Sequence, residues 1–141
     1  GRCELHTDAE RATQSDTIDK VGSPALKIHA DTFHMNIEEN NPAEAIRSAG
    51  DHKGHMHASG SHRGIPGTGH VDWIGIFAAL KDIAYDGDIC IETFSTDNDT
   101  IARAVSLWIQ RFDSPQQLAL EGLSFLREAW DRAQGAEGIA P

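Results

Sequence analysis

The chain has 141 residues, of which 24% are charged, and 22 acidic against 12 basic residues give a formal net charge of −10. This length is sufficient for one domain with a hydrophobic core. Binding of nucleic acid or of an anionic membrane needs a basic face, so the acidic excess argues against both partners. No apolar stretch approaches the roughly 20 residues of a membrane-spanning helix. Cys3 and Cys90 are too few for a disulfide framework, and we expect a cytoplasmic protein.

Short apolar runs alternate with amphipathic stretches along the chain, which is typical of parallel strands joined by helices. Asn41, Asp72 and Ser114 are good N-caps, and a proline directly follows the first and the third of them. In chain order the sequence predicts a helix over 7–21, a strand over 25–30, a helix over 42–49, a strand over 53–58, a helix from 73, a strand over 88–93, a helix that includes 101–112 and a helix from 115.

Three of the predicted helices carry an apolar stripe at helical spacing, and we expect each stripe to face the core. Stripes of this kind are packing features and give no evidence for a cofactor. The stripes are Trp73, Ile76, Phe77, Leu80 and Ile83 in the first of these helices, Ile101, Val105, Trp108 and Phe112 in the second, and Leu123, Leu126 and Trp130 in the third.

Three potential metal ligands, Asp31, His57 and Glu92, each stand at the end of a short apolar run. Because the carboxyl ends of parallel strands lie at one rim of a sheet, we expect these side chains to meet in one pocket. Carboxylate oxygens and a neutral imidazole suit Mn²⁺, Mg²⁺ or Co²⁺ better than a structural zinc, which prefers thiolates. Taken alone, an aspartate after a strand is more often a helix or turn cap than a ligand, so Asp31 has two interpretations.

The fold class that this pattern favours is α/β, with residues 1–134 forming part of a (β/α)₈ barrel and residues 135–141 a disordered tail. A complete barrel has eight strands and about 250 residues. About three strand-helix units after one helix are predicted, and the chain begins without a start methionine, so we expect a barrel truncated upstream. An open doubly wound sheet is the alternative, since its sites also lie at carboxyl strand ends. Gly67-Thr-Gly69 is only weak evidence for a dinucleotide site.

Residues 31–39, with the sequence Asp-Thr-Phe-His-Met-Asn-Ile-Glu-Glu, closely resemble the signature of the ketose 3-epimerases. These enzymes, which include the D-tagatose and D-psicose 3-epimerases, belong to the xylose-isomerase-like barrel superfamily. The resemblance runs without a gap from about Arg2 to Glu92 and implies the C-terminal part of such a barrel. It continues through Gly54-His-Met-His57, Arg63, Pro66-Gly-Thr-Gly69, Trp73, Ile76-Phe77, Ala79-Leu-Lys81, Tyr85-Asp-Gly87 and Ile91-Glu92.

The resemblance implies a metal ion, usually Mn²⁺ with Mg²⁺ or Co²⁺ as substitutes. In the family two glutamates, one aspartate and one histidine hold this ion, and Asp31, His57 and Glu92 match three of these ligands. The fourth, a glutamate, would lie a few residues before Gly1 and is absent from the chain. We therefore expect three ligands of a four-ligand site.

The resemblance also implies residues that bind the substrate. Glu4 matches a family glutamate near the substrate, and His34 and Arg63 match a histidine and an arginine that contact substrate oxygens. The chain departs from the family pattern at Gly60, where many members have glutamate, and at Cys3, where an aromatic ring is usual. These departures concern the sugar-binding contacts more than the metal site.

The implied activity is a metal-dependent epimerisation of a ketose, with Glu92 as a catalytic residue. Inverting a carbon next to a ketone needs a base, a cation that stabilises the enediolate, and an acid on the opposite face. Glu92 would serve one face and the absent glutamate the other, so we expect the isolated chain to be inactive. The expected partners are a small-molecule ketose and either further copies of the chain or the missing part of the barrel.

Two other functions fit the same residues. The first is another isomerase of the superfamily, of the hydroxypyruvate or inosose type, and the second is a non-catalytic truncated barrel. A metal-dependent DNA endonuclease is disfavoured, because it needs a basic cleft that a chain with a net charge of −10 does not offer.

Overall fold

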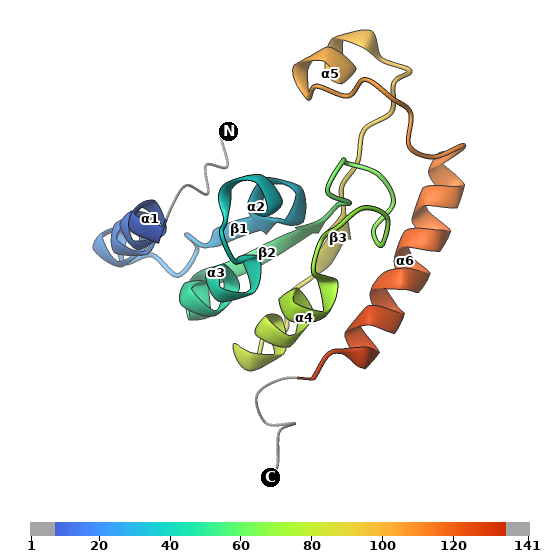
Figure 1. Ribbon diagram of the computed structural model, residues 1–141. Helices are drawn as coiled ribbons and strands as arrows, with labels where there is room; N and C mark the ends of the chain where they lie inside the picture. Colours follow the sequence, from blue (N-terminus) through green and yellow to red (C-terminus); the bar gives the residue numbers. More distant parts are fainter. Residues whose placement is uncertain (1–7, 135–141) are drawn as a thin grey trace.

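A parallel three-stranded sheet forms the centre of the computed structural model, which describes residues 8–134 (Figure 1). The strands are hydrogen-bonded in the order β1-β2-β3, so β2 is central. The elements are α1 (Asp8–Val21), β1 (Ile28–Asp31), α2 (Thr32–Glu38), α3 (Pro42–Ala49), the 3₁₀ turn η1 (Gly50–His52), β2 (Lys53–Ala58), α4 (Trp73–Asp82), β3 (Ile89–Ile91), α5 (Asp99–Ala104) and α6 (Pro115–Arg132).

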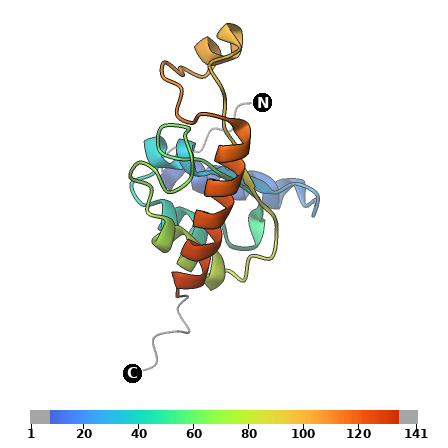
Figure 2. The ribbon, with the colours of Figure 1, turned by 90° about the vertical axis from the view of Figure 1, so that its right-hand side faces the viewer.

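Helices α3, α4 and α6 pack along one side of the sheet (Figures 1 and 2). The strand residues on this side are Ile28, Ala30, Met56 and Ala58, which are at most 8% exposed and belong to one apolar cluster with the helices. Lys81 joins two of the helices, because its ammonium group donates to the carbonyl oxygen of Trp130 at 2.7 Å. This is the buried face of a parallel α/β sheet.

The alternate strand positions form the opposite side of the sheet, which we call the polar face. His29, His55 and His57 are half-buried there, and Cys90 is exposed. In a (β/α)₈ barrel the helices form an outer ring, so the polar face corresponds to the barrel interior. The predicted parallel α/β arrangement is therefore confirmed, and the described residues supply three of the eight strands that a barrel has.

The first strand begins later than predicted, at Ile28 in place of residue 25, and it includes Asp31. Directly after it comes α2, a helix that the sequence analysis did not predict. Asp31 is its N-cap, because the backbone N–H of Phe33 donates to Asp31 Oδ1 at 2.8 Å. The cap interpretation of Asp31 is therefore correct, and it leaves Oδ2 available for other contacts.

The predicted helix over 101–112 is wrong beyond its first turn. Helix α5 ends at Ala104, and Ser106 has a φ of 55°, a left-handed conformation that does not continue a helix. Trp108 is 81% exposed, while Phe112 packs into a small second cluster with Ile65 and Leu118. The apolar residues of this stretch therefore do not share a helical stripe.

Helix α6 begins at Pro115 as predicted, with Ser114 as its N-cap, but its buried stripe differs from the prediction. Leu126 is buried, whereas Leu123 is 43% exposed. The buried side also includes Gly122, where an added Cβ would lie 2.9 Å from Ile91 Cδ1. A glycine here lets α6 approach the last strand closely, and the residues buried along the helix are Leu118, Gly122, Leu126 and Ala129.

Among residues 8–134, no helix has the length and apolar character needed to cross a bilayer. The predicted tail over 135–141 and the predicted substrate contact Glu4 lie outside the described residues.

Candidate metal centre

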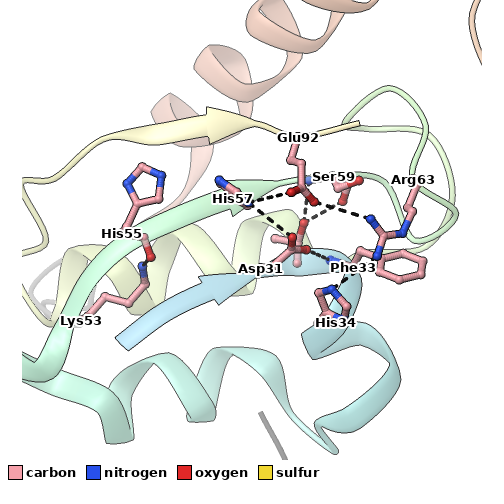
Figure 3. Close-up of polar contacts among 10 residues, drawn as sticks. Asp31, Phe33, His34, Lys53, His55, His57, Ser59, Arg63 and Glu92 are labelled. Carbon is pink, nitrogen blue, oxygen red and sulfur yellow. Dashed lines mark hydrogen bonds and ion pairs between the residues drawn. The ribbon is translucent and has the colours of Figure 1, made fainter. Parts of the chain in front are cut away.

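Three parallel strands bring Asp31, His57 and Glu92 together at their carboxyl ends (Figure 3). Asp31 ends β1, His57 pairs with it in register on β2, and Glu92 follows β3 directly. His57 Nδ1 lies 3.6 Å from Asp31 Oδ2 and 3.3 Å from Glu92 Oε1. One ligand atom from each residue falls within 4.8 Å of the other two, which is the spacing of a group able to share one ion.

The side chains of this cluster lie at the border between the core and the solvent. The Asp31 side chain is only 4% exposed, whereas those of His57 and Glu92 are 23% and 30% exposed. Burial raises the pKa of the Glu92 carboxyl, and a hydrogen bond to Asp31 and the negative charge of Asp31 raise it further, while His57 and Arg63 act in the opposite direction. Two carboxylates this close repel each other, and a bound cation would relieve the repulsion.

Arg63 lies beside the carboxylate cluster and contacts both Glu92 and His34. Its Nη1 is 3.6 Å from Glu92 Oε2, and its Nη2 is 3.3 Å from His34 Nε2. The guanidinium carbon lies over the rings of Phe33 and Phe94, at 4.0 and 4.9 Å from their centroids. Burial lowers the pKa of Arg63, and the nearby carboxylates of Glu92 and Asp31 oppose that shift. The two rings and the carboxylate fix a planar cation at the edge of the cluster.

A tight loop after β2 places Arg63 in this position. The N–H of Arg63 donates to the carbonyl of Gly60 at 2.9 Å, and the N–H of Gly60 donates to the carbonyl of Gly64 at 3.1 Å. Arg63 itself has a φ of 61°, which is uncommon for a residue with a side chain. Thr93 secures the loop, because its hydroxyl donates to the carbonyl of Arg63 at 2.5 Å. Residues held in such conformations are often found at functional sites.

The structure brings five of the predicted site residues together, namely Asp31, His57, Glu92, His34 and Arg63. The sequence analysis missed the aromatic rings that hold Arg63. Phe33 and Phe94 each stand two residues after a predicted ligand, Asp31 and Glu92, and this spacing is the signal that could have identified them.

Thr32 and Ser59 join the carboxyl ends of β1 and β2 beneath the candidate metal centre. The Thr32 hydroxyl donates to the carbonyl of Ser59 at 2.7 Å and accepts from its N–H at 2.7 Å. Both residues are 1% exposed. The backbone groups of Ser59 therefore depend on one side chain in a region that excludes water.

We expect Thr32→Val to lower the free energy of unfolding by about 1–3 kcal/mol, because it leaves a buried N–H without its acceptor. Urea unfolding followed by circular dichroism measures this loss. Thr100→Val on the exposed side of α5 is the matched control and should change stability by less than about 0.5 kcal/mol. Equal effects of the two substitutions would show that the hydroxyl bridge does not support the site.

Comparison with known proteins shows the family of the chain. A model of the xylose isomerase-like TIM barrel family matches residues 4–129. The chain therefore belongs to this family. The predicted fold class, an α/β chain that forms part of a barrel, is confirmed, and the open doubly wound sheet is excluded.

Within the family the chain is similar to ketose 3-epimerases. It is 39% identical to the L-ribulose 3-epimerase of Methylomonas sp. (strain DH-1) over 115 residues, which are 80% of this chain and 40% of that protein. It is 46% identical to the D-psicose 3-epimerase of Enterocloster bolteae over 93 residues, which are 66% of this chain and 31% of that protein.

A solved structure supports the same assignment. The D-allulose 3-epimerase of Methylomonas sp. in complex with D-allulose matches with a TM-score of 0.77 and 37% sequence identity, over 84% of this chain and 42% of that chain. The chain therefore spans less than half the length of the relatives that it matches. The predicted resemblance to ketose 3-epimerases is confirmed at the level of sequence and of fold.

Proposed function

We propose that this sheet forms part of the active site of a metal-dependent ketose 3-epimerase. The observation that supports this most strongly is the group of Asp31, His57 and Glu92 at the carboxyl ends of three parallel strands. Active sites of (β/α)₈ barrels lie at this rim. The similarity to epimerases of L-ribulose and D-psicose supports the reaction type, and the relative solved with D-allulose supports a ketose as substrate.

The donor set fits a divalent cation that prefers oxygen. Two carboxylates and one imidazole suit Mn²⁺, Mg²⁺ or Co²⁺, and we propose Mn²⁺ as the resident ion. When bound, the ion supplies positive charge that stabilises an enediolate developing on the substrate. Three of its ligands would be Asp31, His57 and Glu92, and further positions remain for substrate oxygens or for other protein ligands.

The remaining roles follow from the contacts of each side chain. We assign Glu92 as the base that removes the proton next to the ketone, because its carboxylate lies at the rim beside the proposed metal position and is 30% exposed, where a substrate could reach it. Arg63 contacts Oε2 of Glu92 and thereby orients this carboxylate and partly neutralises its charge. His34 and the free side of the Arg63 guanidinium would donate to substrate oxygens. Glu4 remains a further proposed substrate contact.

Each of the two outer strands of the sheet has an edge with which a further strand could pair. Within the described residues, β1 and β3 each pair with β2 alone, so each has one edge without a strand. We propose that further barrel strands, on this chain or on a second copy, pair with these edges, since open edges promote association. Size-exclusion chromatography with light scattering distinguishes a monomer from an oligomer.

Metal binding gives the first test. We expect Asp31→Asn and His57→Gln each to weaken Mn²⁺ binding, measured as the free Mn²⁺ signal in electron paramagnetic resonance. Asparagine is as good an N-cap as aspartate, so Asp31→Asn removes a charged ligand and keeps the cap of α2. Asp86→Ala, an exposed carboxylate at the opposite end of the sheet, is the control. Unchanged Mn²⁺ affinity in both variants would contradict the metal centre.

Activity gives the decisive test. We define the barrel chimera as the L-ribulose 3-epimerase of Methylomonas sp. in which this chain replaces the segment that it matches. With Mn²⁺, we expect the barrel chimera to interconvert ketoses that differ at C3 and to exchange the C3 proton with solvent deuterium. A folded chimera that binds Mn²⁺ but exchanges no substrate proton would overturn the proposed function.

A further inference from the structure

A cluster of three histidines lies on the polar face, next to the metal centre. Two of them, His29 and His55, are two residues further from the carboxyl ends of their strands than Asp31 and His57 are. His29 comes from β1, and His55 and His57 come from β2. The ring of His29 lies 4.1 Å from that of His57 and 4.9 Å from that of His55, and the two rings on β2 are 5.2 Å apart. One nitrogen atom of each ring falls within 4.8 Å of the other two.

Sheet geometry accounts for this cluster. His29 pairs in register with His55, so the two side chains are cross-strand neighbours. His57 follows His55 by two residues, and side chains at that spacing share a face of a strand. Figure 3 shows His55 and His57 along the same strand, with His57 turned toward the carboxylates of Asp31 and Glu92. His57 is therefore the one residue common to both clusters.

The two clusters differ in the atoms that they offer to an ion. The rim cluster offers two carboxylate oxygens and one nitrogen, whereas the histidine cluster offers three nitrogens. Carboxylates suit Mg²⁺ and Mn²⁺, and imidazoles suit Zn²⁺, Ni²⁺ and Cu²⁺. Three imidazoles with an open fourth position form a known type of tetrahedral zinc site.

We propose that His29, His55 and His57 form a second metal site, which takes Zn²⁺ or a similar nitrogen-preferring cation. The proposal of this second site rests on the proposed function only because the two metal sites share His57. A neutral imidazole has a single lone pair for a metal, so His57 serves one of the two ions at a time. Zn²⁺ in the histidine site therefore removes a ligand from the Mn²⁺ centre and competes with Mn²⁺ without using Asp31 or Glu92.

The test titrates Zn²⁺ against a chromophoric chelator in the untagged chain and its variants. We expect His29→Gln and His55→Gln to lose the saturable Zn²⁺ binding of the unmodified chain and to keep its Mn²⁺ binding. Glu92→Gln should weaken Mn²⁺ binding and leave Zn²⁺ binding in place. His70→Gln, which changes an exposed loop histidine, is the matched control. Circular dichroism and thermal melting verify that each variant is folded.

Competition between the ions gives the second readout. In the unmodified chain, added Zn²⁺ should release Mn²⁺ and raise its free paramagnetic resonance signal. In His29→Gln and His55→Gln this release should disappear at the same Zn²⁺ concentrations.

The possible results separate the two proposals. Zn²⁺ binding that survives both histidine substitutions, or that falls with Glu92→Gln and Asp31→Asn instead, would overturn the histidine site and leave the Mn²⁺ centre intact. Histidine-dependent Zn²⁺ binding in a chain that binds no Mn²⁺ would support the histidine site and contradict the proposed function.

Discussion

Glu92→Gln is expected to lower epimerase turnover of the barrel chimera by a factor on the order of 10²–10⁴, the usual contribution of a positioned acid or base. Glutamine keeps the size of the side chain and one oxygen that can face the proposed metal ion. It removes the carboxylate that we propose as the acceptor of the substrate proton. Mn²⁺ binding should weaken but remain measurable, and the Michaelis constant should change less than the turnover number.

Solvent-deuterium exchange at C3 of the substrate measures the proton-transfer step directly. We expect Glu92→Gln to lose this exchange together with turnover, at saturating Mn²⁺. Glu121→Gln on the exposed side of α6 is the matched control and should retain both. His34→Ala should instead raise the Michaelis constant, because its proposed contact is to substrate oxygens. Near-normal exchange in Glu92→Gln would mean that Glu92 is only a structural residue or a metal ligand.

Phe77→Ala should have the largest effect on stability, a loss of about 3–5 kcal/mol in the free energy of unfolding. Phe77 is 1% exposed, and its ring packs against the rings of Trp73 at 5.8 Å and Trp130 at 5.5 Å. It therefore joins α4 to α6 behind the sheet. Removing the ring leaves a cavity in a closely packed core, where the surrounding side chains relax only partly.

Urea unfolding measures this loss, and two further variants make the result specific. Ile74 lies on the same helix and is 39% exposed, so Ile74→Ala should lower the free energy of unfolding much less than Phe77→Ala does. Phe77→Leu should recover most of the stability, because it refills most of the cavity. If Phe77→Ala cost no more than Ile74→Ala, the core would not depend on the contact between α4 and α6.

The elements that the sequence predicted correctly are those with a local chemical signal. The side chain of Asn41 accepts from the N–H of Glu44, and that of Ser114 accepts from the N–H of Gln117, as expected of N-caps. The stripe that begins at Trp73 is buried at Ile76, Phe77 and Leu80, as helical periodicity predicts. Caps and stripes are properties of a few neighbouring residues, so they can be recognised without knowledge of the fold.

The wrong predictions concern stretches where tertiary contacts decide the structure. Trp108 and Phe112 have helical spacing with Ile101, but the chain turns at Ser106 and carries Phe112 to a cluster at the start of α6. Helix α2 was missed because residues 32–38 mix β-branched, aromatic and polar side chains without an apolar stripe. Its cap and its packing against the strands define it, and neither has a periodic signal.

The position of the three candidate ligands was predictable from the sequence, and the residues that surround them were less so. Strand-end position and residue type were sufficient to place Asp31, His57 and Glu92 at one rim. The rings that hold Arg63 and the bridge between Thr32 and Ser59 join residues that are far apart in the sequence. Such pairs become apparent only when the register of the strands is known.

Asp31 links the chemistry of the rim to the position of a helix. One of its oxygens caps α2, which carries His34, and the other faces His57. An ion bound at the second oxygen would therefore also act on the helix that carries His34, the proposed substrate contact. If ion binding strengthens the binding of a sugar to this helix, thermodynamic reciprocity requires the sugar to raise the affinity for the ion by the same factor. Cofactor and substrate would thus be recognised cooperatively through a single carboxylate.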